Sequence, residues 1–260
     1  MIIVADNLHI IHPTIAQAVE AFDPGPITDW VLRCVAAGAQ AIDINSGPLV
    51  KDPQRRMAFL VETVRAATQL PIFLDTTNPV ALRAGLEACQ GAAAINGFSL
   101  EPAKVEKILP LAQAFDADIV GYLLQPDCRM PVDEDEMMAL AVALFDTFSK
   151  TGLSPQRLII DPVIAPLSWQ EGVRHNQSVL ALLRTLPDLL GVPVRTIAGL
   201  SNLASGAMPL ERKIALEQAF LPMLAASGLD MVLVNVLHGP TMEIIKTSNA
   251  LLSETIFSWG

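Results

Sequence analysis

The chain has 260 residues, of which 52% are hydrophobic and only 5% aromatic, so one domain can bury a large aliphatic core. Acidic residues outnumber basic ones by 27 to 17, and the formal charge of -10 argues against nucleic acid as a partner, because such a surface repels phosphate backbones. The first residues, MIIVADNLHIIHP, carry no basic segment and include Asp6 and Asn7, which favours a strand over a signal peptide and predicts a cytoplasmic protein. The apolar stretch 224–237 is interrupted by Asp230 and Asn235 and is too short to cross a bilayer, so no membrane association is expected.

Eight short runs rich in Ile, Val and Leu recur along the chain, and each is followed by a longer segment with helical periodicity. The runs cover residues 2–6, 41–45, 72–76, 93–99, 119–124, 158–164, 195–202 and 231–237. Two helix starts are predicted at Asp52–Pro53 and Asn78–Pro79, because Asp and Asn are favoured at the N-cap and proline at the first helical position. With no break in composition, this alternation predicts an α/β fold, a single (β/α)8 TIM barrel spanning residues 1–260 as one domain. An open, doubly wound sheet is the alternative, since periodicity does not reveal whether the sheet closes.

Small polar residues stand where most of these expected strands end. They are Asp6 or Asn7, Asp43 and Asn45, Asp75, Asn96, Asp161, Asn202 and Asn235. In a barrel the carboxyl ends of all strands surround one mouth, and catalytic groups come from these ends and the loops that follow. No comparable set is seen at the strand beginnings, so the sequence predicts a functional site at the carboxyl end.

Each of these residues also has a purely structural interpretation. Asn45 and Asn78 fit the role of a helix cap or turn residue well. Asp75 and Asp161 fit it less well, because each lies inside or directly after an aliphatic run, where an ionised carboxylate needs hydrogen-bond donors. A ring of carboxylates and amides with little positive charge suits a flat heterocycle with an amino-pyrimidinone edge, since a carboxylate accepts two hydrogen bonds from such an edge.

Other kinds of site have little support in the sequence. The glycine motifs of nucleotide-binding loops are absent, so no nucleotide cofactor is indicated. The four histidines, His9, His12, His175 and His238, lack the spacing of metal ligands, so no bound metal is expected. Arg212 lies ten residues past Asn202 and either contacts an anionic tail of the ligand above the mouth or is a surface arginine.

Several segments occur in the order and spacing of a known family. They are AIDINSGP (41–48), LDTTNPVALRAGLEAC (74–89), the strand with Asn96 followed by EPAKVEKILPLA (101–112), IIDPVIAP (159–166) and GLSN (199–202). Over essentially the whole chain, this ordered set resembles the pterin-binding methyltransferases, most closely the methyltetrahydrofolate:corrinoid protein methyltransferases.

The resemblance implies a TIM barrel, usually a homodimer, that uses tetrahydrofolate or methyltetrahydrofolate as substrate. It implies that the methyl group moves by SN2 displacement between N5 of the folate and Co(I) of a corrinoid, a cobalamin carried by a partner protein. Asp75, Asn96 and Asp161 would bind the pterin ring, and Asn202 would form a hydrogen bond with N5 during transfer. The remaining candidate substrate-binding residues are Asp6, Asp43, Arg212 and Asn235.

The first strand departs from the family pattern. Members tend to carry Glu-Arg-x-Asn at its end, whereas this chain has Asp6, Asn7, Leu8 and His9, which keeps an acid but lacks the Arg and the Asn. A non-catalytic folate-binding protein is therefore one alternative function. A dihydropteroate synthase-like enzyme is another, although that family ends its seventh strand in a basic motif and this chain has GLSNLAS there. A barrel enzyme acting on an unrelated substrate is the third.

Overall fold

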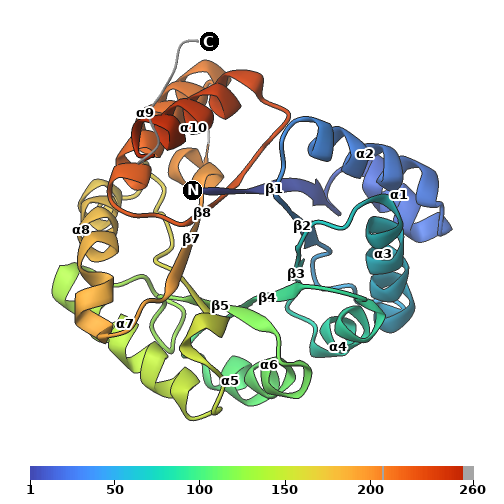
Figure 1. Ribbon diagram of the computed structural model, residues 1–260, viewed down its shortest axis with the longest axis horizontal. Coiled ribbons are helices and arrows are strands. Elements are labelled where there is room, and N and C mark those ends of the chain that lie inside the picture. The colour runs from blue at the N-terminus through green and yellow to red at the C-terminus, as the bar shows by residue number, and fades with distance from the viewer. Residues whose placement is uncertain (207, 254–260) are drawn as a thin grey trace.

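The computed structural model describes residues 1–206 and 208–253. They form a closed barrel of eight parallel strands that follow one another in chain order, with helices around the outside (Figure 1). The predicted (β/α)8 TIM barrel is therefore confirmed, and the open doubly wound sheet is excluded because β1 pairs with β8.

All eight predicted strands are present. They are β1 (Ile2–His9), β2 (Ala41–Asn45), β3 (Ile72–Asp75), β4 (Ala93–Phe98), β5 (Asp118–Tyr122), β6 (Leu158–Asp161), β7 (Arg195–Gly199) and β8 (Met231–Val234). Several predicted runs continue past the observed strand ends, because their last residues belong to the loops of the carboxyl end. After β7, for example, the chain turns into the short 3-10 helix η2 (Leu200–Ala204), which contains Asn202.

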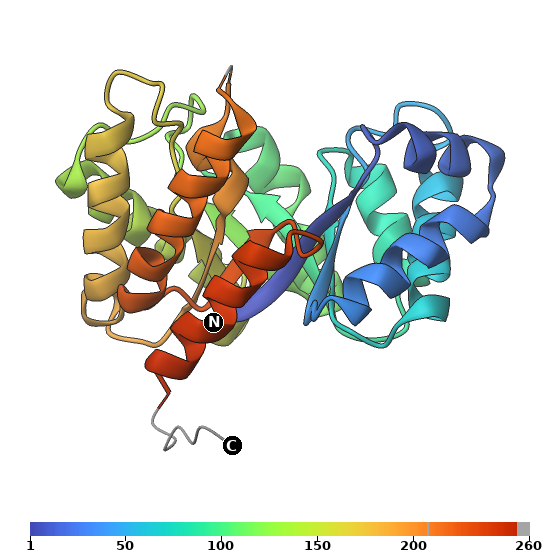
Figure 2. The ribbon, with the colours of Figure 1, turned by 90° about the horizontal axis from the view of Figure 1, so that it is seen from above.

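Helices separate the strands and cover the outside of the barrel. They are α1 (Pro13–Ala21), α2 (Pro24–Ala36), α3 (Pro53–Ala67), α4 (Pro79–Ala88), α5 (Pro102–Lys107), α6 (Leu109–Phe115), α7 (Glu134–Ser149), α8 (Gly172–Leu190), α9 (Leu210–Ala226) and α10 (Gly239–Leu251), with the 3-10 helix η1 (Pro155–Arg157) before β6. The amino group of Met1 donates to Asn249 Oδ1 at 3.0 Å, so the start of the chain lies beside the last turn of α10 (Figure 2). Within the described residues, no helix combines the length and apolar character needed to cross a membrane.

The two predicted helix starts are correct, but only one of the two caps forms. Asn78 accepts hydrogen bonds from the backbone N–H groups of Val80 and Ala81 at the start of α4. Asp52 precedes α3 with a φ of 47° and makes no capping hydrogen bond with its side chain. A capping side chain normally reaches the helix from an extended backbone, and the left-handed conformation of Asp52 does not provide it.

The barrel interior has an apolar part and a polar part. The apolar part is a buried cluster that includes Ala41, Phe73, Ala94, Val120 and Ile159. Because side chains of a strand alternate between its two faces, the residue two positions further along each strand also faces the interior. Those residues are Asp43, Asp75, Asn96, Tyr122 and Asp161. The alternation thus places a polar group at the carboxyl end of five consecutive strands.

Candidate functional site

Four polar side chains of β2, β3 and β4 form the centre of the site. The strand register places Asn45 level with Asp75, and Asp75 level with Asn96. Asn45 Nδ2 donates to Asp75 Oδ2 at 2.6 Å, and Asn96 Nδ2 donates to Asp43 Oδ1 at 3.0 Å. The interpretation of Asn45 as only a cap or turn residue is therefore incomplete, because its side-chain amide donates a hydrogen bond to the Asp75 carboxylate of the site.

Tyr122, at the end of β5, belongs to this cluster but was missed by the sequence analysis. Its hydroxyl donates to Asn96 Oδ1 at 2.7 Å. Burial, reinforced by the charges of nearby acids, raises the pKa of Tyr122 well above its usual value, so the hydroxyl keeps its proton. Both ends of the Asn96 amide are thus held, one by Tyr122 and the other by Asp43. The signal that could have found Tyr122 is its position two residues after the inward-facing Val120.

Asp161, at the end of β6, is held by its own loop. Its Oδ1 accepts a hydrogen bond from the backbone N–H of Val163 at 2.7 Å. Val163 has a φ of 59°, which is unusual for a β-branched residue. His175 on α8 stabilises this loop, since its Nε2 lies 2.8 Å from the Val163 carbonyl oxygen and its Nδ1 lies 3.2 Å from that of Pro131. His175 therefore anchors two loops of the carboxyl end.

The ends of β1 and β8 are joined by two asparagines. Asn7 Nδ2 donates to Asn235 Oδ1 at 2.7 Å, and Asn7 Oδ1 accepts from the backbone N–H of Val236 at 3.0 Å. Asn235 Oδ1 also accepts from the backbone N–H of Leu237 at 3.0 Å. The side-chain oxygen of Asn235 is thus engaged within the protein, and its ligand-binding role stays a prediction that rests on the amide nitrogen.

Asn202 lies at the mouth with its side chain exposed. The preceding residue, Ser201, forms a hydrogen bond with the Asp6 carboxyl group, which joins η2 to the end of β1. The Asn202 amide lies over Gly199, where an added Cβ would be 3.4 Å from Nδ2. In the part of the chain that the structure describes, the Asn202 side chain has no hydrogen-bond partner. Its amide is therefore available to a ligand.

Of two basic residues considered for the site, one lies close to the acids. Lys104 on α5, which the sequence analysis missed, is close enough to lower the pKa of Asp75, and its Nζ lies 5.8 Å from the centre of the Tyr122 ring. Its position in the first turn after β4 could have identified it. Arg212 lies in the first turn of α9, exposed and without an ion pair to any described residue. Its predicted contact with a ligand tail stays a prediction.

Four acids share this end of the barrel. Burial is the main cause that raises the pKa of Asp6 to about 6 and of Asp75 and Asp161 to about 7. Burial and the charges of Asp75 and Asp6 raise the pKa of Asp43 well above its usual value. Near neutral pH these carboxyl groups are therefore not all ionised, and a ligand that donates hydrogen bonds would favour their charged form. Across residues 1–206 and 208–253, no group of three or more His, Cys, Asp or Glu side chains is arranged to hold a metal ion.

The strand beginnings carry a different set of charged residues, which the sequence analysis did not single out. Asp118 starts β5 and Arg195 starts β7, while Arg157 directly precedes β6. Arg157 Nη1 lies 3.1 Å from Asp118 Oδ1, and Arg195 Nη2 lies 2.7 Å from Asp118 Oδ2. These charges come from separate strands and neutralise one another only once the barrel is formed, so no local pattern marks them.

Comparisons with known proteins agree with a pterin-binding barrel. The family described as pterin binding enzyme matches residues 16–235. The chain is 25% identical over 257 residues to the methylcorrinoid:tetrahydrofolate methyltransferase of Eubacterium limosum, covering 97% of this chain and 91% of that protein. It is 24% identical over 209 residues to the methionine synthase of Mycobacterium tuberculosis, a match that covers 76% of this chain and 17% of that protein.

Solved structures extend the comparison to the fold. The dihydropteroate synthase of Xanthomonas albilineans, solved with 4-aminobenzoic acid, superposes with a TM-score of 0.70 at 22% identity, covering 98% of this chain and 93% of that one. The enzyme of Stenotrophomonas maltophilia also gives a TM-score of 0.70, at 21% identity, covering 98% and 94%. At these identities the similarity establishes the shared fold.

Proposed function

Because the chain belongs to the pterin-binding enzyme family, we propose that it is a methyltransferase acting between N5 of methyltetrahydrofolate and the Co(I) centre of a corrinoid protein. The main observation behind the proposal is the free amide of Asn202, just after the end of β7. It accompanies a cluster of acids and amides that suits a pterin, called the acid and amide cluster below, which consists of Asp43, Asn45, Asp75 and Asn96. The 25% identity to a methylcorrinoid:tetrahydrofolate methyltransferase over 97% of the chain supports it. We further propose that residues 1–260 act as one domain, as a homodimer, with the corrinoid carried by a separate protein.

The pterin ring would lie across the carboxyl end of the barrel. Its amino-pyrimidinone edge presents neighbouring N–H groups, and a carboxylate such as Asp161 or Asp75 can accept two of them. The side-chain amide of Asn96 has a fixed orientation, because its Nδ2 donates to Asp43 and its Oδ1 accepts from Tyr122. Its second N–H and the second lone pair of its oxygen remain for the ligand. The N–H donors of the ligand would replace the water that burial has removed from the acids, and so stabilise their ionised form.

In the proposed reaction the bond between N5 and the methyl carbon breaks as the bond between the methyl carbon and cobalt forms. A tertiary amine is a poor leaving group, so N5 must gain positive character first. The side-chain carbonyl of Asn202 can accept a hydrogen bond from protonated N5, an interaction that is stronger in the transition state than in the ground state. Alignment of the methyl group for in-line attack would contribute more to the rate.

The direct test mixes the purified protein with methyltetrahydrofolate and reduced cobalamin and follows the absorbance of Co(I). We expect this absorbance to decay only when both protein and methyltetrahydrofolate are present. Folate binding without loss of Co(I) would instead support a non-catalytic folate-binding protein. Formation of dihydropteroate from a pterin pyrophosphate and 4-aminobenzoate would support the synthase.

A second test locates the pterin. Asp75→Asn and Asp161→Asn should each weaken tetrahydrofolate binding by about 10- to 100-fold, because a hydrogen bond to a charged acceptor contributes roughly 1.5–3 kcal/mol. Asp188→Asn is the matched control, since Asp188 is an exposed acid on the outer helix α8. Unchanged affinity in both site variants, measured by isothermal titration calorimetry, would place the pterin elsewhere.

Dihydropteroate synthase is the second candidate function, because solved structures of that enzyme share the fold over nearly the whole chain. The end of β7 weighs against it. From Gly199 onward the described chain carries no Lys or Arg before Arg212, so the expected basic motif for a pyrophosphate-bearing substrate is missing there.

A further inference from the structure

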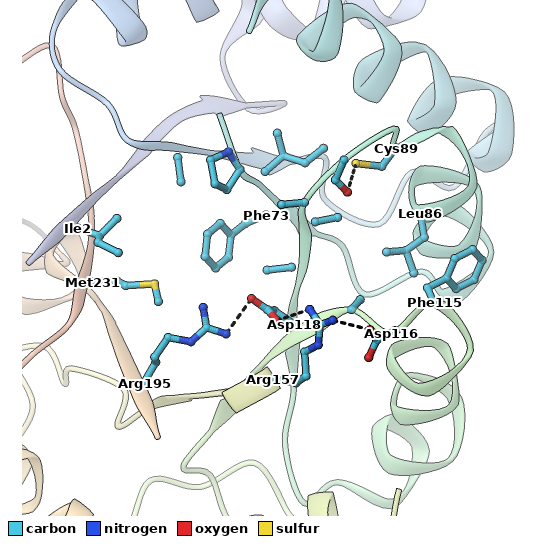
Figure 3. Close-up of a pocket in the computed structure, with 18 of the residues that line it drawn as sticks. Ile2, Phe73, Leu86, Cys89, Phe115, Asp116, Asp118, Arg157, Arg195 and Met231 are labelled. Carbon is cyan, nitrogen blue, oxygen red and sulfur yellow. Dashed lines mark hydrogen bonds and ion pairs between the residues drawn. The ribbon is translucent and has the colours of Figure 1, made fainter. Parts of the chain in front are cut away.

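A cavity of about 670 Å3 opens at the amino-terminal end of the barrel, opposite the acid and amide cluster (Figure 3). Its walls come partly from the ends of α4 and α6 and partly from the beginnings of strands that are far apart in the sequence. They include Ile2, Ala41, Phe73, Ala94 and Met231. The cavity is therefore separate from the proposed pterin site and shares only the barrel with it.

Small side chains leave room for the cavity at this end of the barrel. Barrel interiors are normally filled by layers of bulky branched side chains. At the amino end of β2 and β4 the inward-facing residues are Ala41 and Ala94, so the volume of two large side chains is missing. Phe73 and Met231 face the same interior and give the cavity apolar walls.

Charged residues form one side of the cavity, and their charges balance. Asp118 accepts hydrogen bonds from Arg157 at 3.1 Å and from Arg195 at 2.7 Å. Arg157 also pairs with Asp116, and Arg195 Nη2 donates to the Gln156 carbonyl oxygen at 2.6 Å. Both acids therefore already have cationic partners, and they do not call for a cationic ligand.

Two hydrogen-bond donors that line the cavity have no partner in the described chain. Arg195 Nη1 bonds to no described residue, and Figure 3 shows the guanidinium reaching into the cavity near Met231. Gln40 Oε1 accepts from the backbone N–H of Ile3 at 3.0 Å, which leaves Gln40 Nε2 without a partner in the described chain. Two unused donors, one of them on a cation, match a ligand that brings acceptor oxygens and negative charge.

We propose that this cavity binds a small monocarboxylic acid with a flat apolar body. The body packs against Phe73 and Met231, and the carboxylate accepts hydrogen bonds from Arg195 and Gln40. The alternative is that the ion pairs only hold the strand beginnings together, since the amino end of such barrels ordinarily serves stability. The proposal does not depend on the methyltransferase function.

The first experiment uses 2-naphthoate as the probe and neutral 2-naphthamide as its control. We expect 2-naphthoate to bind the full-length protein in isothermal titration calorimetry, and the amide to bind about tenfold more weakly because it lacks the charge. Equal affinity for the two compounds, or no binding of 2-naphthoate at millimolar concentration, overturns the proposal.

Variants then establish where the probe binds. Ala92→Trp places a large side chain in the cavity from an exposed loop position and should abolish binding without disturbing the core. Arg195→Gln should weaken binding about tenfold, as expected for the loss of a charged hydrogen bond. Asp161→Asn, at the opposite end, should leave the affinity for 2-naphthoate unchanged.

The outcomes separate the alternatives. Loss of binding in Asp161→Asn but not in Ala92→Trp would place the acid at the carboxyl end and overturn the proposal. A lower melting temperature for Arg195→Gln with unchanged affinity would show that the ion pairs are structural only, which also overturns it. A failure of the Co(I) assay leaves this test unaffected, because the binding measurement contains no folate or corrinoid.

Discussion

At the carboxyl end of the barrel, Asp161 is buried with a backbone partner and Asp75 is partly buried with an amide partner, and loss of water contact raises the pKa of both to about 7. At the amino end, Asp118 is also only a quarter exposed, yet it lies between Arg157 and Arg195 and is fully paired. The same eight strands thus bury charge in two different ways.

This difference indicates what each end is built to do. Removing a carboxylate from water without a charged partner costs free energy, so acids like Asp161 weaken the fold when they are ionised. A ligand that donates hydrogen bonds can recover part of that cost. The charges around Asp118 already satisfy one another, so they stabilise the barrel, and only their spare donors remain for binding.

The largest expected effect comes from Asn202→Ala at the carboxyl end. The transfer rate should fall by about 100-fold, because a single preorganised group that acts in the transition state contributes roughly 2.7–4 kcal/mol. The affinity for tetrahydrofolate should change far less. Single-turnover kinetics with reduced cobalamin measures the rate, and Ser205→Ala, one turn further along an exposed segment, is the control. A loss of affinity at an unchanged rate would remove Asn202 from the transition state.

Asp161→Asn tests the cost of burying an acid. The folded-state pKa of about 7 exceeds the unfolded value of 3.8, so the contribution of Asp161 to stability is largest below pH 3.8 and is lost as the pH rises through the folded pKa. Asparagine keeps an acceptor for Val163 N–H and never ionises. Relative to the wild type, the variant should therefore gain about 2–3 kcal/mol in free energy of unfolding between pH 5 and pH 8. Urea titrations of both proteins at both pH values measure this gain. If the free energy of unfolding changed equally with pH in the wild type and the variant, the raised pKa of Asp161 would be contradicted.

Asp118→Asn tests the paired charges at the amino end. Two arginines lose their charged acceptor, so the free energy of unfolding should fall by about 1–2 kcal/mol while the transfer rate stays constant. Asp116→Asn should have a smaller effect, because the Asp116 side chain is 71% exposed. A marked drop in transfer rate for Asp118→Asn would show that the two ends do not act separately.

The fold was readable from the sequence because its signals are local. Apolar runs followed by helical periodicity identify each strand and helix from a few neighbouring residues. A polar residue that interrupts or ends such a run is equally local, and this pattern singled out Asp75, Asn96 and Asp161. The structure brings all three to the same end of the barrel, as the closed parallel sheet requires.

What the sequence did not reveal depends on how separate strands align. Tyr122 forms its hydrogen bond with Asn96 because of the register between β4 and β5. This register cannot be read from the sequence of either strand alone. In the same way, the sequence alone is consistent with Asn45 as a turn residue. Only the pairing of β2 with β3 shows that Asn45 lies beside Asp75 and donates a hydrogen bond to it. The cavity at the amino end depends on which small residues face inward together, and this too requires the assembled barrel.

The smallest effect, and the one that best resolves how the carboxyl end is organised, is expected for Tyr122→Phe. The variant removes the hydroxyl that donates to Asn96 Oδ1, so the amide can rotate away from the orientation that Asp43 favours. Tetrahydrofolate binding should weaken by about 3- to 10-fold, since one neutral hydrogen bond contributes roughly 1 kcal/mol. In an Asn96→Ala background the same substitution should cause no further loss, because the hydroxyl acts through that amide. Additive losses in this double-mutant cycle would mean that Tyr122 contacts the pterin itself.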